Sequence, residues 1–287
     1  MKKRPWLLFA LITTIFWGVW GALMEIPLKE GFPATLGYIV WSVTMIPCAL
    51  VGLWIIHWKL EYDWKSVVQG SVIGFLGAGG QLMLFHALLE GPAYLVFPII
   101  SLSPAVSILL SLLFLKERAS IMNWIGIFLA LVAILFLSYQ EPNNTIVRSY
   151  LWLLFAILIF LMWGIQAFVM KFANLRMKAE SIFFYMMLTG VLLSPVAYLM
   201  TDMDREINWG FRGPYLTAMI QVLNAIGALM LVYALRYGKL IIVSPLTNAL
   251  APVITVVISL LIYAVIPHII VLIGMILALI AIFLLIR

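Results

Sequence analysis

The chain has 287 residues, of which 66% are hydrophobic and only 10% are charged. Because ordinary soluble domains are about one quarter charged, this composition excludes a soluble globular protein and indicates a chain that lies in lipid. The net charge of +6 comes from basic residues that lie between apolar stretches, so it does not indicate a nucleic-acid partner.

Ten apolar segments follow one another, and most have the ~20 residues that a membrane helix needs. The first is too long for the apolar part of a signal peptide, so we expect it to be a retained span. A tight turn near Pro267 is needed to separate the last two segments. We therefore predict an all-α polytopic membrane protein with ten transmembrane helices. The expected spans are residues 6–27, 34–56, 66–89, 92–115, 121–139, 151–170, 181–200, 213–235, 240–263 and 269–286.

The basic residues between the spans predict the orientation. With a cytoplasmic N-terminus, the loops and span ends on the inside receive most of the lysines and arginines, as the positive-inside rule requires. An even number of spans leaves both termini cytoplasmic, and the expected location is the cell (inner) membrane. Lys171 near the inner end of the sixth span is expected to extend to the interface. The inner set is Lys2, Lys3, Arg4, Lys59, Lys65, Lys116, Arg118, Lys171, Arg176, Lys178, Arg236, Lys239 and Arg287, and the outer set is Lys29, Arg148, Arg205 and Arg212.

The two halves of the chain resemble each other. IFWGVWGALMEIPLK in the first half aligns with FLMWGIQAFVMKF in the second, which places Glu25 opposite Lys171. Since each half holds five spans, an odd number, the second half enters the membrane from the opposite side. We therefore predict two inverted five-helix repeats, residues 1–140 and 150–287, an arrangement typical of transporters. Further matched pairs are Trp17 and Trp163, Gly91 and Gly238, Pro98 and Pro245, Pro104 and Pro252, Ser107 and Thr255, and Ser111 and Ser259.

Prolines recur at matched places in spans four and nine, and each removes a backbone hydrogen bond from its helix. Broken helices in hydrocarbon are tolerated beside protein or a polar cavity. The matched placement favours a pair of gating elements around a central cavity, and static kinking for packing is the alternative. The gating candidates are Pro98, Pro104, Pro245 and Pro252.

The five-plus-five layout, the tryptophan-glycine pairs and the run LLFLKERASIMNWIGIFLALVAILF resemble the EamA type of the drug/metabolite transporter superfamily. The glutamate-then-glycine element, Glu117 and Gly126, is the most specific part of the resemblance. The second half has Val265 where this pattern has a glutamate, so the role of Glu117 is not repeated there. The resemblance implies a secondary carrier and leaves its substrate open.

Polar and aromatic side chains near the middles of the spans are the candidate substrate contacts. Tryptophan normally prefers the membrane interface, so two at matched central positions indicate facing walls of a cavity, or else packing inside the bundle. Amides inside spans bind a polar substrate or join helices. The substrate-binding candidates are Trp17, Trp20, Gln81, Tyr94, Trp163, Gln166, Gln221, Asn224 and Asn248.

Glu25 is the one acidic residue inside an apolar segment. An acid within a span is costly and is often functional, so Glu25 is the candidate coupling group, through a proton or through attraction of a cation. His86 lies at a similar predicted depth and is its candidate partner. The alternative is that Glu25 lies at the wet interface.

The leading functional hypothesis is a secondary active transporter that moves a small polar or amphipathic metabolite, such as an amino-acid-like, cationic or drug-like solute, by alternating access. A lipid flippase or scramblase of the same fold is the alternative. The sequence carries no phosphate-binding loop, catalytic dyad or metal-ligand spacing, so we expect no enzyme activity, cofactor or metal. Expected partners are the solute, the bilayer, and a proton or exchanged solute, in a monomer or homodimer. Cys48 is the only cysteine, which excludes an internal disulfide.

Overall fold

The computed structural model describes residues 4–142, 150–263 and 267–286, and these ranges contain helices and no strand. Nine helical stretches in these ranges are long and apolar enough to cross a membrane, and a tenth, residues 121–137, is shorter. The first-half elements are α1 (Pro5–Leu23), α2 (Glu25–Lys29), α3 (Ala34–Ile55), α4 (Trp64–Glu90), α5 (Ala93–Ser101), α6 (Ser103–Leu110), the π-helical turn η1 (Ser111–Leu115) and α7 (Ile121–Leu137). The second-half elements are α8 (Leu151–Ala173), α9 (Ala179–Leu192), α10 (Ser194–Leu199), η2 (Phe211–Tyr215), α11 (Leu216–Tyr237), α12 (Leu240–Tyr263) and α13 (Ile269–Ile286).

Polar side chains in the preceding loops set the starts of helices α4 and α7. Asp63 precedes α4 and accepts a hydrogen bond from the Ser66 amide, and the Ser66 side chain and amide hold the pKa of the Asp63 carboxyl below its usual range. Ser120 and Asn123 form a reciprocal cap at the start of α7. Such caps satisfy amide groups that have no partner within the helix, and they explain why these two helices start where they do.

The fourth and ninth spans differ, although the sequence predicts a pair of broken helices. The fourth span breaks at Leu102, and α6 starts again with Pro104 in its first turn. The ninth span is one continuous helix, α12, with Pro245 and Pro252 inside it. Between these prolines, Thr247 donates a side-chain hydrogen bond to the Val243 carbonyl and Asn248 donates one to the Ser244 carbonyl of the same helix. The expectation of two broken helices is therefore wrong for the ninth span.

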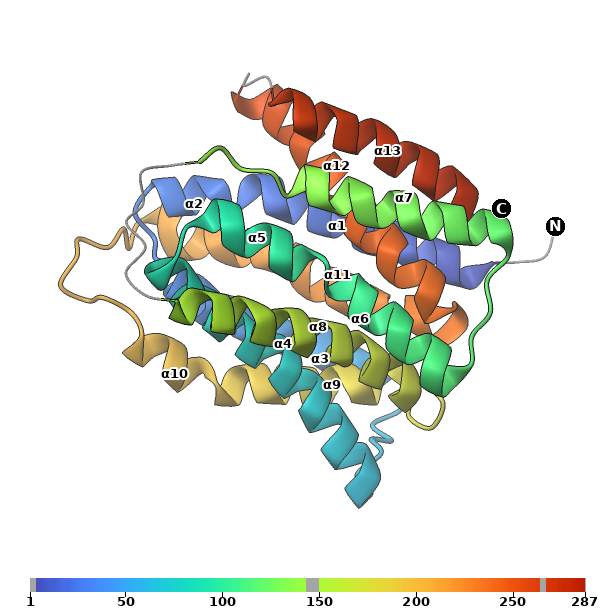
Figure 1. Cartoon of the computed structure of the whole chain (residues 1–287). Helices are drawn as coiled ribbons and strands as arrows, with labels where there is room; N and C mark the ends of the chain where they lie inside the picture. Colours follow the sequence, from blue (N-terminus) through green and yellow to red (C-terminus); the bar gives the residue numbers. More distant parts are fainter. Residues whose placement is uncertain (1–3, 143–149, 264–266, 287) are drawn as a thin grey trace.

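Helix packing follows the inverted repeat (Figure 1). Helix α1 packs on α11 and α12, and its counterpart α8 packs on α4 and α6. Helix α3 packs on α11 as α9 packs on α4, while α7 and α13 pack on each other. These contacts of the first half thus recur with the halves exchanged, as an approximate two-fold axis in the membrane plane requires. The two ends of the described chain lie at the same end of the bundle, where Arg4 donates to the Ile286 carbonyl.

Matched glycines bring the two halves into close contact. The ring of Trp17 on α1 lies where a side chain at Gly227 of α11 would be, and Trp163 on α8 lies in the same way against Gly80 of α4. Because glycine has no Cβ, an indole ring can lie directly on the neighbouring backbone. The repeat predicted from the sequence is therefore present at the level of individual contacts. Further matched contacts are Trp6 with Gly238 and Trp152 with Gly91, and Gly18 with Ile254 and Gly164 with Val106.

This close packing predicts that Gly80→Ala and Gly227→Ala each destabilise the protein. The new Cβ would lie 2.5 Å from Trp163 Nε1 in the first variant and 2.6 Å from the Trp17 ring in the second. Overpacking costs about 1–3 kcal/mol, which outweighs the ~1 kcal/mol by which alanine favours a helix over glycine. Thermal unfolding of the purified protein in detergent should therefore occur at a lower temperature in both variants.

Gly79→Ala is the matched control for this measurement. Its new Cβ would lie 3.4 Å from the flexible Met162 Cε, an ordinary contact distance. Its unfolding temperature should equal or exceed that of the parent. If all three variants unfold together with the parent, the indole rings do not press on these glycines.

Candidate functional site

The two central tryptophans are held by backbone contacts between the halves. Trp17 Nε1 donates to the Asn224 carbonyl at 3.3 Å, and Trp163 Nε1 donates to the Gly77 carbonyl at 3.4 Å. Both side chains are half-buried. The structure therefore brings each predicted tryptophan against a helix of the opposite repeat, which is the symmetric placement expected from the sequence.

Two of the predicted amide side chains, Gln221 and Asn224, belong to one hydrogen-bonded group, and the other predicted polar residues lie apart from it. Gln221 on α11 accepts from Trp20 Nε1 at 3.0 Å and from the Asn224 amide at 3.4 Å, and it donates to the Gly37 carbonyl at 3.4 Å. This group joins α1, α3 and α11. Elsewhere, Gln166 lies over Gly77, Asn248 donates to its own helix at Ser244, and Gln81 and Tyr94 are half-buried on α4 and α5.

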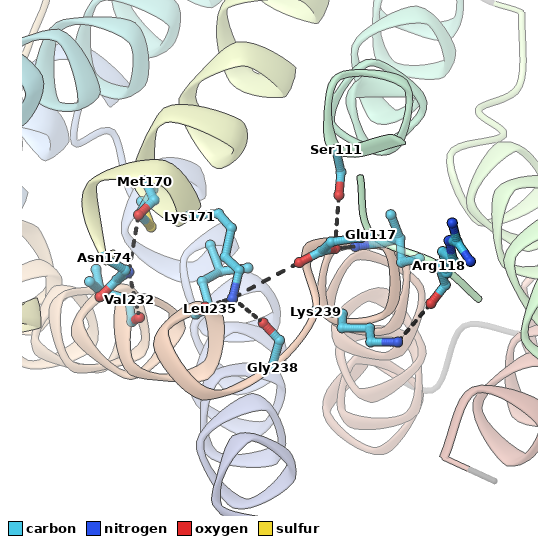
Figure 2. A network of polar contacts seen from close by, with 11 residues as sticks. Ser111, Glu117, Arg118, Met170, Lys171, Asn174, Val232, Leu235, Gly238 and Lys239 are labelled. Atoms are coloured by element: carbon cyan, nitrogen blue, oxygen red, sulfur yellow. Dashed lines mark hydrogen bonds and ion pairs between the residues drawn. The ribbon is translucent and has the colours of Figure 1, made fainter. Parts of the chain in front are cut away.

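A buried ionic group lies where the sequence predicts an ordinary interfacial lysine (Figure 2). Lys171 Nζ donates to the carbonyls of Leu235 at 2.8 Å and Gly238 at 2.7 Å, and lies 4.0 Å from Glu117 Oε1. The Lys171 and Glu117 side chains are only 12% and 10% exposed. The expectation that Lys171 extends to the interface is therefore wrong, because the last carbonyls of α11 provide it with acceptors inside the bundle.

Glu117 is positioned by an unusual end to the fourth span. The π-helical turn η1 ends at Lys116, whose φ of 52° lies in the left-handed region. This conformation reverses the chain, and Glu117 Oε2 then accepts from Ser111 Oγ at 2.8 Å and from the Ile241 amide at 3.1 Å. Glu117 thus connects the end of span four to the start of span nine. We call Ser111, Glu117 and Lys171, with the carbonyls of Leu235 and Gly238, the Lys171 cluster.

Other contacts, some between the halves and some within the second half, lie at the same end of the bundle, which we call the Lys171 end. Lys239 Nζ donates to the Arg118 carbonyl at 2.7 Å, as Figure 2 also shows, and Arg236 donates to the Met177 carbonyl at 2.9 Å. The Tyr233 hydroxyl donates to the buried Glu180. Asn123 at the start of α7 donates to the Leu284 carbonyl at the end of α13, at 3.1 Å. Together these contacts close the bundle at the Lys171 end.

The opposite end, which we call the Glu25 end, contains a cavity of about 510 Å³. Its wall includes Thr255 and Ser259, which the repeat matches with Ser107 and Ser111, and Glu25, which it matches with Lys171. The positions that close the Lys171 end therefore line an open space here. Val265, the counterpart of Glu117, lies outside the described residues. The cavity is lined by Glu25, Lys29, Leu137, Tyr139, Glu141, Thr255, Val256, Ser259, Leu260, Pro267, His268 and Val271.

Glu25 does not contact its predicted partner. Its carboxylate pairs with Lys29 one turn further on, at 2.7 Å, and the Glu25 side chain is 45% exposed. His86 is exposed on α4, and its ring stacks on Phe155 of α8 with centroids 6.1 Å apart. The proposed pair of Glu25 with His86 is therefore wrong, because α1 packs against α11 and α12 whereas α4 packs against α8.

The Lys171 cluster predicts strong coupling between its two charges. Lys171→Met leaves Glu117 buried without its cation, and breaking a buried pair typically costs about 3–5 kcal/mol. Adding Glu117→Gln to that variant should restore part of the lost stability, since no uncompensated charge then remains. We therefore expect a double-mutant cycle on thermal unfolding to be clearly non-additive.

Lys178 and Glu61 provide the matched control. They are 3.9 Å apart, and their side chains are 39% and 26% exposed. Solvent weakens such a pair to about 0–1 kcal/mol, so Lys178→Met should change the unfolding temperature little. A cycle on Lys171 and Glu117 that is as additive as the control cycle would show that the cluster is not coupled.

Comparisons with known proteins agree with this architecture. The uncharacterised protein MJ1333.1 of Methanocaldococcus jannaschii is 30% identical over 137 residues, which are 47% of this chain and 97% of that protein. Its length thus corresponds to one of the two repeats. A crystal structure described only as that of a protein is 17% identical, with a TM-score of 0.78, and the match covers 98% of this chain and 96% of that one. That likeness shows the fold alone.

The sequence profile of the EamA-like transporter family matches residues 4–139 and again residues 150–287. The two matches cover almost the whole chain and agree with the resemblance noted from the sequence. Together with the exchanged helix contacts, they show that the protein is built from two copies of one unit. The chain belongs to the EamA-like transporter family, within the drug/metabolite transporter superfamily.

Proposed function

We propose that this protein is a secondary transporter that carries a small polar or amphipathic solute across the cell membrane by alternating access. The supporting observation is the difference between matched places at the two ends of the bundle. The Lys171 cluster is buried and closed, whereas the matched wall at the Glu25 end lines a cavity of about 510 Å³. The two halves of an inverted repeat can hold two different conformations. When each half adopts the conformation of the other, the closed end opens and the open end closes.

The basic residues suggest which end faces the cytoplasm. The Lys171 end carries Lys178, Arg236 and Lys239, and the short loops there hold most of the positive charge of the chain. By the positive-inside rule we assign this end to the cytoplasm. In this conformation the protein then presents its cavity to the outside and is closed towards the cell.

The central residues are the proposed path between the ends. We assign solute contacts to Trp17, Trp163 and the amide group around Gln221, which lie between the two repeats. The break of span four at Leu102 gives it a natural bending point beside Pro104. Pro252 lies inside the continuous α12, so we propose that the ninth span bends there only when the conformations exchange.

Exchange of the two conformations can be measured through a matched pair of cysteines. On a Cys48→Ala background, Ser259→Cys lies in the wall of the cavity and Ser111→Cys lies in the Lys171 cluster. Ser111 is fully buried, whereas Ser259 is partly exposed. A membrane-impermeant maleimide should therefore react readily with the cysteine at 259 and slowly with the cysteine at 111.

Adding Lys171→Met to the cysteine variants should reverse the preference of the maleimide for position 259 over position 111. The closed Lys171 end then loses its cation and that cation's two hydrogen bonds to the end of α11. Labelling at 111 should rise, and labelling at 259 should fall in the same sample. Lys178→Met is the matched control and should change neither rate. If labelling at 111 rises while labelling at 259 stays constant, the Lys171 end has merely loosened and alternating access is contradicted.

Uptake into proteoliposomes tests the solute directly. Ligands found by thermal shift should accumulate or exchange across the membrane, since a ligand that binds the folded state raises its stability. Transfer of a fluorescent lipid between leaflets, with no movement of any soluble ligand, would instead identify a lipid flippase.

A further inference from the structure

The two matched ends carry opposite charges on the same structural element. Lys171 lies near the end of α8, and its counterpart Glu25 lies at the corresponding end of the first span. In the closed Lys171 end, an ammonium group binds the last carbonyls of α11. The matched site at the Glu25 end presents a carboxylate instead. Because of this charge reversal, the closed state of the Glu25 end is stabilised by a different group from the one that stabilises the closed Lys171 end.

The carbonyls matched to those of the Lys171 cluster belong to the end of α4. Leu88 and Gly91 correspond to Leu235 and Gly238, and Trp152 covers Gly91 as Trp6 covers Gly238. The last carbonyls of a helix lack partners within it and carry its partial negative charge. A cation is stable at this place, whereas a bare carboxylate is repelled.

We infer that a positive charge bound at Glu25, supplied by a proton or by the ammonium group of a solute, stabilises the closed state of the Glu25 end. A protonated carboxyl donates a hydrogen bond to a carbonyl, and an ammonium group bridges the carboxylate and the carbonyls as Lys171 does. The inference rests on the proposed alternating access and names the cargo or coupling charge of that same site.

Neighbouring groups are compatible with a cation at this place. Lys29 pairs with Glu25 now, but its side chain is 62% exposed, and solvent makes such a pair weak. Ser259, matched with Ser111, places a hydroxyl in the cavity wall, as Ser111 provides one to Glu117. The other ionisable groups around the cavity are Tyr139 and Glu141 after α7 and His268 before α13, where the rings of Tyr139 and His268 lie 4.6 Å apart.

The cysteine at position 259, on the Cys48→Ala background, reports closure of the Glu25 end. At about pH 8 without added ammonium, the maleimide should label this position fast. Acidification to about pH 5.5 should slow labelling roughly tenfold beyond the loss of reactivity of the thiol itself, and n-butylammonium at about pH 8 should slow it roughly tenfold, as the closed state becomes the major one. n-Butanol is the neutral match of the ammonium probe and should have no effect. Protection by acid alone identifies a proton, and protection by n-butylammonium at constant pH identifies an ammonium solute.

Two variants of Glu25 separate its charge from its shape. Glu25→Gln supplies an amide donor without charge, so it should be protected already at about pH 8. Acid should slow its labelling only through the thiol itself, and n-butylammonium should not affect it. Glu25→Lys reproduces the chemistry of Lys171 and should also be protected. Comparing each variant with the parent at the same pH cancels the effect of pH on the thiol itself.

His268→Gln and Lys29→Gln test the neighbouring groups. Both variants should keep the dependence on a positive charge, since neither changes Glu25. If His268→Gln abolishes the effect of acid, or if Glu25→Gln responds as the parent does, the inference is overturned. The reversal of labelling between positions 111 and 259 in the Lys171→Met variant does not depend on these results. Failure of this inference is therefore distinguishable from failure of the proposed function.

Discussion

A buried ammonium group bound to the end of a helix is the interaction on which this conformation depends. Lys171 has little access to water, so its charge is stable only because α11 ends beside it and Glu117 lies 4.0 Å away. Glu117 in turn depends on the π-helical turn and on the left-handed Lys116, which bring it back towards Ile241. Four helix ends are thus fixed by two side chains. The other contacts at this end align the same surfaces and add to the closure.

Much of the fold follows from the sequence, because lipid restricts a chain to apolar helices of sufficient length. The predicted ninth and tenth spans agree with α12 and α13, and the predicted second span differs from α3 by one residue. The internal repeat also predicts the contacts of Trp17 and Trp163, since matched residues must find matched neighbours. These features depend on hydrophobicity and on local similarity, both of which are visible in a single sequence.

The site is less predictable, because it depends on where helix ends meet. Lys171 near the end of a span has the appearance of an interfacial lysine, and only the position of α11 reveals its carbonyl acceptors. The suggested pairing of Glu25 with His86 relied on depth alone, which does not tell which helices are neighbours. A usable signal was present, since Glu117 and Lys171 have opposite charges at the same predicted end of two spans. The continuity of α12 was not evident from its prolines.

The shortness of one helix pair has a consequence for the surrounding lipid. Helices α7 and α13 pack side by side and have 17 and 18 residues. At 1.5 Å per residue they measure about 26 Å and 27 Å, whereas the 27-residue α4 measures about 40 Å. A typical hydrocarbon core is about 30 Å thick, so the bilayer beside this pair must thin while the flank that holds α4 is spanned with length to spare. The protein therefore sits in an uneven membrane, and acyl-chain length will affect the two flanks in opposite ways.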